Sequence, residues 1–267
     1  MKSKKEYPQD FKTMFGLSTM GLMSVAGASF MTSLFMLYLT DYAGIGAMAA
    51  VLGTVLLLVG RIVDAVDDPL QGWIMDSARI TKIGKYKPFC FISTITILIS
   101  IIALYNIPSA VVQKPALIVL WVVLFYLVYD IGISFYAAEP LKQTLTDDVN
   151  VRAKMAMWPR IIGMLGAMPF AFFLAMTTGL NQRIGDMNRS FSLMAIILIV
   201  PIALLSLLGT VLVKEGKYSH FETEKRAKLS MKDIFDMLKT NEPLKAQFLA
   251  VLFSGFIWTM VFATATY

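Results

Sequence analysis

Long stretches without a single charged residue constrain this chain most. Most of these stretches reach the roughly 17–25 residues that a helix needs to cross a bilayer. They follow one another along the 267 residues at Leu17–Leu39, Gly44–Gly60, Pro88–Gln113, Pro115–Tyr129, Ile161–Gln182, Ser190–Val213 and Ala246–Tyr267. The second and fourth stretches are short, and each reaches full length only if the acids that follow it, Asp64–Asp68 and Asp130, lie inside the membrane. We therefore predict an all-α integral membrane protein with seven spans, the last of them cut off.

The distribution of positive charge predicts the orientation. The N-terminal segment and the connections after spans 2, 4 and 6 hold 19 lysines and arginines, whereas the alternate connections hold only Lys114, Arg183 and Arg189. Because positively charged loops stay in the cytoplasm, the N-terminus is expected there, in a multi-pass protein of the cell membrane, inner or plasma. The net charge of +6 follows from this topology. The expected macromolecular partner is therefore the lipid bilayer, not a nucleic acid.

Residue usage argues against an enzyme. The single histidine, His220, lies in a polar loop, and the single cysteine, Cys90, opens the third span. No pairing of a nucleophile with a base and no spacing typical of metal ligands is present. We expect a protein without enzymatic activity and without a cofactor apart from a coupling ion.

The second span carries charges that need an explanation, because a charge at the bilayer centre costs roughly 2.5–3.5 kcal/mol. Its sequence, "GRIVDAVDDPLQGW", contains Arg61 and the acids Asp64, Asp67 and Asp68. On a helix, Asp64 and Asp68 stand at positions i and i+4 and share a face with Arg61, whereas Asp67 is displaced to the side. Arg61 can neutralise one acid but not three.

A proline adds an oxygen to this cluster. Pro69 has no N–H, so the carbonyl of Ala65 loses its helical partner. Two carboxylates and a loose carbonyl suit a small alkali cation, with Asp64 and Asp68 as ligands of Na⁺, or a shared proton. The alternative is a buried ion-pair network that only joins helices.

Aromatic and charged residues in spans 4 and 5 indicate a lining for a polyol. Tyr126 and Asp130 stand at i and i+4, and Trp158 and Arg160 flank a proline at the start of span 5. Sugars stack on rings and bind bidentate polar partners. Trp158 could instead belong to an interfacial aromatic belt, and Arg160 could extend to the interface.

At these residues the sequence resembles a known family. "GRIVDAVDDPLQGWIMD" with the following "GKYKPF" is similar to the helix 2 and loop 2–3 signature of the glycoside–pentoside–hexuronide:cation symporters, which are melibiose-permease-like members of the major facilitator superfamily. "LTDDVNVRAKM", the pair Pro159-Arg160 and "MKDIFDMLKTNEPL" also resemble that family. The resemblance implies a twelve-helix transporter, of which this chain is the first half plus helix 7.

The resemblance also implies roles for individual residues. It makes Asp64 and Asp68 the cation ligands, with Asp67 between them, and places Arg160 on the substrate side. It makes Asp130 the candidate bridge between cation and sugar. The uncharged first span departs from melibiose-type members, which hold sugar hydroxyls with an acid there. A loop motif that closes the cytoplasmic gate through charge pairs is matched by Gly72, Asp76 and Gly84-Lys85.

The expected organisation has three parts: a six-helix bundle over 1–213, a cytoplasmic loop over 214–245 and a truncated helix 7 over 246–267. Within the loop, Ser230 and Asp233 predict a helix start, and Ile234, Phe235 and Leu238 predict its apolar face. A linker with one docked helical turn is the alternative. Because the bundle lacks its opposing half, we expect the chain alone to insert in a membrane without transporting.

The sequence thus predicts secondary active transport, with a sugar, glycoside or uronide carried together with Na⁺, or with H⁺, by alternating access. Three acids near one arginine favour Na⁺. A lysolipid or another amphiphile is an alternative cargo, supported by the uncharged first span. A membrane sensor or scaffold that transports nothing is the alternative from a different class.

Overall fold

A computed structural model describes residues 10–43, 45–46, 48–146, 148–215, 236, 239–243, 245–247 and 249–250. The side chains of residues 33, 50, 54, 57–62 and 64–69 lie outside this description. The chain divides into two compact units, Met1–Phe221 and Glu222–Tyr267. The predicted face of Ile234, Phe235 and Leu238, and most of helix 7, fall outside the described residues. In the second unit residues 239–240 are helical and Asn241 is not.

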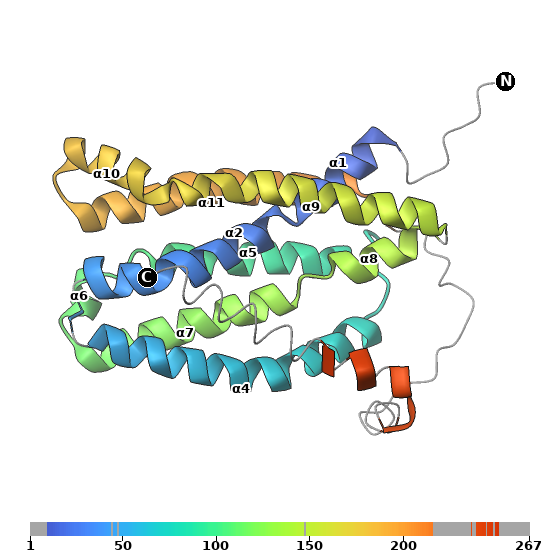
Figure 1. Ribbon diagram of the computed structural model, residues 1–267, viewed down its shortest axis with the longest axis horizontal. Coiled ribbons are helices and arrows are strands. Elements are labelled where there is room, and N and C mark those ends of the chain that lie inside the picture. The colour runs from blue at the N-terminus through green and yellow to red at the C-terminus, as the bar shows by residue number, and fades with distance from the viewer. Residues whose placement is uncertain are drawn as a thin grey trace. The chain divides into compact units, whose positions relative to one another are not determined.

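The named elements of the first unit are all helices, which run lengthwise in a bundle (Figure 1). The first rod consists of α1 (Phe11–Met20), α2 (Leu22–Ser29), η1 (Phe30–Leu34), α3 (Phe35–Leu37) and η2 (Tyr38–Tyr42). It is followed by α4 (Met48–Ser77), α5 (Lys87–Leu104), α6 (Ser109–Val112), α7 (Pro115–Ser134), α8 (Ala138–Leu145), α9 (Val149–Ala171), α10 (Phe173–Ile184) and α11 (Met187–Leu212). The prediction of an all-α membrane fold is confirmed.

Several of these helices are long and apolar enough to cross a membrane. In the described part of the chain they are Phe11–Thr32, Lys87–Leu104, Pro115–Leu145 and Met187–Leu212, and the bent pair α9–α10 forms a fifth candidate. Helices α4 and α7 continue beyond their uncharged runs, because a span needs apolar residues only where it meets hydrocarbon. The α9–α10 pair bends by 42°. Pro169 accounts for the bend, since it lacks the N–H for Leu165 and precedes the break at Phe172.

The connections gather at two ends of the bundle. The start of α1, the α4–α5 connection, α8 and the end of α11 lie at one end, on the right in Figure 1. The α5–α6 connection and the α10–α11 turn lie at the other end. The described lysines and arginines of the α4–α5 connection and of α8 therefore lie at the same end of the bundle, and the orientation of that end in the membrane stays a prediction.

Close approach of α1 and α11 is a main packing contact. A Cβ on Gly209 of α11 would come 2.7 Å from the carbonyl oxygen of Gly16 on α1. The Ser206 hydroxyl donates to the Met20 carbonyl at 2.6 Å and lies 3.1 Å from the Thr94 hydroxyl of α5. Small residues let membrane helices touch, and hydroxyls then bond across the interface. These contacts tie α1, α5 and α11 together.

A reciprocal polar clamp joins the start of α5 to the end of α11. The Glu215 carboxylate, 1% exposed, accepts hydrogen bonds from the backbone N–H groups of Lys85 (2.8 Å), Tyr86 (2.9 and 3.0 Å) and Lys87 (2.9 Å). In return, the Lys87 ammonium donates to the carbonyl of Val213 at 2.6 Å. An anion thus meets the donors of a helix start, and a cation meets the acceptors of a helix end.

Gly84 makes the clamp possible. Its φ is +124°, in the region that favours glycine, and a Cβ there would collide with the Glu215 carboxylate. The turn before it closes through Thr81, whose hydroxyl donates to the Gly84 carbonyl at 2.6 Å.

Removing the carboxylate of the clamp should destabilise the bundle strongly. We expect Glu215→Ala to cost about 3–5 kcal/mol, because it leaves buried N–H groups and the Lys87 ammonium without their anion. Thermal unfolding in detergent can be followed with a thiol-reactive fluorophore, since Cys90 is the single cysteine and is 1% exposed. Asp41→Ala is the control, because Asp41 is an exposed acid of η2, and this surface substitution should cost at most about 0.5 kcal/mol. Equal losses in the two variants would contradict the clamp.

The α1–α11 crossing makes an independent prediction. Gly209→Ala should cost about 1–3 kcal/mol, because the added methyl group forces the two helices apart. Gly179→Ala, in α10, meets open space and should leave stability unchanged or raise it by up to about 1 kcal/mol. The same fluorophore assay compares the two variants. If the Gly209→Ala protein is as stable as the parent, α1 and α11 can accommodate a methyl group and their contact does not require glycine.

Candidate functional site

The three acids of the predicted cation site lie on α4. The helix is continuous from Met48 to Ser77, so Asp64 and Asp68 are one turn apart on one helix face. The helix also continues through Pro69, which cannot donate to the Ala65 carbonyl. The side chains of Arg61, Asp64, Asp67 and Asp68 lie outside the described part of the structure. Their coordination of a cation therefore stays a prediction.

No metal centre forms elsewhere in the described residues. Among them, no group of three or more His, Cys, Asp or Glu side chains comes together as a candidate metal site. His220 lies outside these residues, and Cys90 is buried at the start of α5.

Asp130 and Tyr126 stand one turn apart on α7, which packs directly against α4. Asp130 is 5% exposed and Tyr126 is half-buried. Tyr129 joins them, with its ring 6.4 Å from that of Tyr126 and close to Gly27 of α2. None of these three residues is without an interaction partner. A buried carboxylate thus lies on the helix that neighbours the three acids of α4.

Trp158 and Arg160 lie on α9, which packs against α1 and α2. Both side chains are exposed on this chain, with Trp158 at 46%. Apolar residues of α9 are also exposed around them: Met157, Ile161, Met164, Leu165 and Met168. An arginine on an otherwise apolar face is what a site for a polar ligand inside a membrane protein needs. No contact of the described residues brings Arg160 to Asp130, although α2 contacts both of their helices.

The residues predicted to form a gate meet at the α4–α5 connection, apart from Gly72. The Lys85 ammonium donates to the backbone carbonyl of Asp76 at 2.8 Å, and the Tyr86 hydroxyl lies 3.4 Å from the Asp76 carboxylate. The ammonium also stands 5.2 Å from the centre of the Tyr86 ring. Gly72 lies a turn earlier on α4, where a Cβ would meet open space. Packing within the described residues therefore does not require glycine there, and the gating role of all three residues stays a prediction.

Sequence reasoning missed the anchor of this connection. The sequence analysis counted Lys87 among the basic residues of a connection and gave Glu215 no role. In the structure these two residues form the clamp that holds the connection carrying Lys85. The available signal was an acid shortly after the apolar run that ends at Val213, together with a lysine directly before the apolar run that begins at Pro88. The separation of 128 positions along the chain hid the pairing of these two residues.

Parts of the chain are similar in sequence to carrier and symporter proteins. The chain is 42% identical to the glucuronide carrier protein homolog of Escherichia coli (strain K12) over 90 residues. This alignment covers 33% of the chain and 19% of that protein. The chain is 28% identical over 213 residues to the raffinose carrier protein of Pediococcus pentosaceus, covering 76% of this chain and 32% of that protein. It is 27% identical over 113 residues to the sodium-dependent lysophosphatidylcholine symporter 1 of Gallus gallus, covering 40% of this chain and 20% of that protein. The chain thus spans about a third or less of the length of each.

The family match is broader than any of these. A family described as MFS/sugar transport protein matches residues 14–267, which run from within α1 through α11 and beyond. It also includes the acids of α4, the buried Asp130 of α7 and the exposed Arg160 of α9. This match confirms the resemblance seen in the helix 2 signature and assigns the chain to transporters rather than enzymes. The chain belongs to the MFS/sugar transport protein family.

Proposed function

We propose that this chain is part of a symporter that carries a sugar, glycoside or uronide together with Na⁺. The observation that carries the proposal is the family match over a bundle in which the acid-bearing helix α4 packs against the helix of buried Asp130. In the proposed mechanism Asp64 and Asp68 bind the cation, with Asp67 beside them. Asp130 and Tyr126 connect that site to the sugar, which Trp158 and Arg160 contact from α9.

Electrostatics gives the reason for coupling. Several carboxylates in a membrane helix are costly when empty, and a cation that binds among them lowers that cost. A ligand can shift a conformational equilibrium only by its difference in affinity for the two states. Cation and sugar sites that share Asp130 would each bind better when the other is filled, and the coupling is reciprocal.

Na⁺ is proposed over H⁺ because hard oxygen ligands and an excess of acids suit a metal ion. The name of the Gallus gallus relative includes sodium dependence, which supports the choice. That name also supports a lysolipid as an alternative cargo. Two sugar-carrier names and the polar residues of α7 and α9 favour the sugar. The N-terminus is proposed to be cytoplasmic, with Gly72, Asp76 and Lys85 at the cytoplasmic gate.

Neutralising either acid of the α4 pair should abolish the effect of Na⁺. We expect Asp64→Asn and Asp68→Asn to insert in the membrane normally, because each removes a charge without changing size. The factor by which Na⁺ increases the binding of p-nitrophenyl α-galactoside and p-nitrophenyl β-glucuronide should then fall at least tenfold. The measurement is equilibrium binding to membranes with Na⁺ or with choline as the cation.

Asp41→Asn is the matched control, since Asp41 is an exposed acid of η2 and should leave the stimulation intact. Full stimulation in both α4 variants would contradict the cation site. Glycoside binding that ignores Na⁺ at fixed pH but changes with pH would favour H⁺ over Na⁺ as the coupling ion.

Removing the guanidinium of α9 should affect the substrate and spare the cation. Arg160→Ala should raise the dissociation constant of the bound p-nitrophenyl glycoside about tenfold or more, because a charge-assisted hydrogen bond contributes about 1.5–3 kcal/mol. The concentration of Na⁺ that gives half of the remaining stimulation should stay within about twofold. Lys154→Ala, an exposed cation of the same helix, is the control. An unchanged dissociation constant in Arg160→Ala would contradict the substrate contact and favour an Arg160 side chain that extends to the membrane interface.

A further inference from the structure

The geometry points to a binding site for the headgroup of a membrane phospholipid, in a cleft between the α5–α6 connection and α11. The cleft has a volume of about 380 Å³. It is lined by residues of the α5–α6 connection and of the first turns of α11: Asn106, Ile107, Asn188, Arg189, Ser192 and Leu193. It lies at the end of the bundle that holds the α10–α11 turn, away from the Glu215 clamp. It contains none of the residues proposed for transport.

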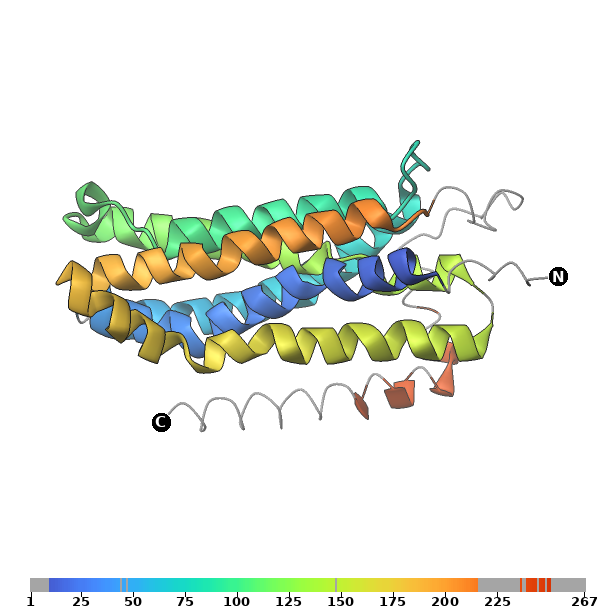
Figure 2. The ribbon, with the colours of Figure 1, turned by 90° about the horizontal axis from the view of Figure 1, so that it is seen from above.

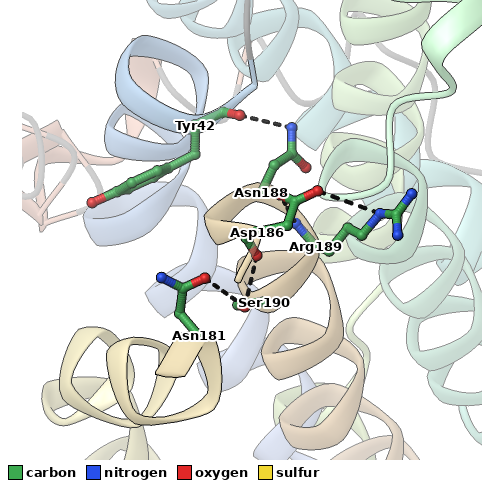
Figure 3. Close-up of polar contacts among 6 residues, drawn as sticks. All are labelled: Tyr42, Asn181, Asp186, Asn188, Arg189 and Ser190. Carbon is green, nitrogen blue, oxygen red and sulfur yellow. Dashed lines mark hydrogen bonds and ion pairs between the residues drawn. The ribbon is translucent and has the colours of Figure 1, made fainter. Parts of the chain in front are cut away.

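Hydrogen bonds fix the polar groups of the cleft. The amide nitrogen of Asn188 donates to the Tyr42 carbonyl at 2.7 Å, as Figure 3 shows, and that of Asn106 donates to the Ile102 carbonyl at 2.9 Å. With their nitrogens held in this way, the two amides retain their oxygens as acceptors. The Arg189 side chain, 79% exposed, contacts Asp186 through Nε at 3.4 Å. Its two terminal nitrogens make no recorded contact within the described residues.

These groups match the chemistry of a zwitterionic or glycerol headgroup. A guanidinium binds a phosphate through paired N–H donors. The amide oxygens accept from an ammonium or hydroxyl group, which phosphatidylethanolamine and phosphatidylglycerol carry a few atoms from the phosphate. One cation and two acceptors in one cleft therefore suit a phosphodiester with a donor group beyond it.

An apolar strip below the cleft fits the acyl chains. Arg189, Leu193 and Ile197 follow one another at four-residue steps on one face of α11, so the charge stands directly above exposed aliphatic side chains. Leu193 is 44% exposed and Ile197 is 53% exposed. On α5, which packs beside α11 (Figure 2), Ile95 and Ile99 are 46% and 50% exposed. A free sugar or free phosphate would use the polar groups and leave this strip uncovered, whereas a phospholipid covers both.

The test measures lipid binding to the protein purified in detergent, by native mass spectrometry with added phosphatidylethanolamine. Wild type should retain one lipid tightly. Arg189→Ala should weaken this binding about tenfold, and Arg189→Lys should lie between the two because it keeps the charge without the paired donors. Arg183→Ala is the matched control, since Arg183 is an exposed arginine of the last turn of α10, outside the cleft.

Folding of the alanine variant is expected to survive. The Asp186 carboxylate caps α11 through the backbone N–H of Arg189 at 3.1 Å, and the substitution keeps that bond. A second variant, Leu193→Asn, interrupts the strip without touching the charge and should also weaken lipid binding several-fold.

Two further ligands separate the headgroup from the tails. Diacylglycerol, which has tails and no phosphate, should bind weakly and equally to wild type and Arg189→Ala. Glycerophosphoethanolamine, which has the headgroup and no tails, should fail to displace the lipid at equal concentration. Equal lipid binding by wild type and Arg189→Ala would overturn the proposal. Effective displacement by glycerophosphoethanolamine or by methyl glucoside would also overturn it, in favour of a soluble polar ligand.

Discussion

The paired contacts of Glu215 and Lys87 are the interaction on which the bundle most depends. Helix ends carry unsatisfied donors and acceptors, and at a membrane surface those groups can be buried away from water. Here one carboxylate serves the donors at the start of α5, and one ammonium serves the acceptors at the end of α11. Both charges are buried, so each stabilises the structure only while the other partners are in place. Removing one leaves an uncompensated charge.

The clamp also determines where the flanking segments lie. It fixes the backbone of Lys85 and Tyr86, and these two residues contact Asp76 at the end of α4. The position of the acid-bearing helix is thus tied to the α5–α11 pair through a short rigid connection. The hydroxyls of Thr94 and Ser206 extend the same pairing to α1. Polar contacts therefore link the clamp to the end of α4, the helix that carries the proposed cation ligands.

Much of the fold follows from the sequence, because hydrocarbon imposes a simple rule of length and polarity on each span. The apolar runs predict the rods, and the family signature around Asp64 and Asp68 predicts which rod carries acids. Local geometry was less predictable. The π-helical turns at Phe30–Leu34 and Tyr38–Tyr42, the break after Pro169 and the short helix Ala138–Leu145 leave no trace in hydropathy. The Glu215 clamp could not be predicted, since only the fold brings its partners together.

The helices of the bundle differ in the side chains that they expose. The helices α5 and α11 expose aliphatic residues and are held together at one end by the clamp and near the middle by Thr94 and Ser206. Helix α9 instead exposes methionines with Trp158 and Arg160. Methionine side chains are flexible and adapt to changing surfaces, whereas a strip of isoleucine and leucine suits a constant contact with lipid. The two surfaces therefore differ in the side chains that they offer to a ligand. A cleft for a resident lipid fits the first surface, and a site for a transported polar ligand fits the second.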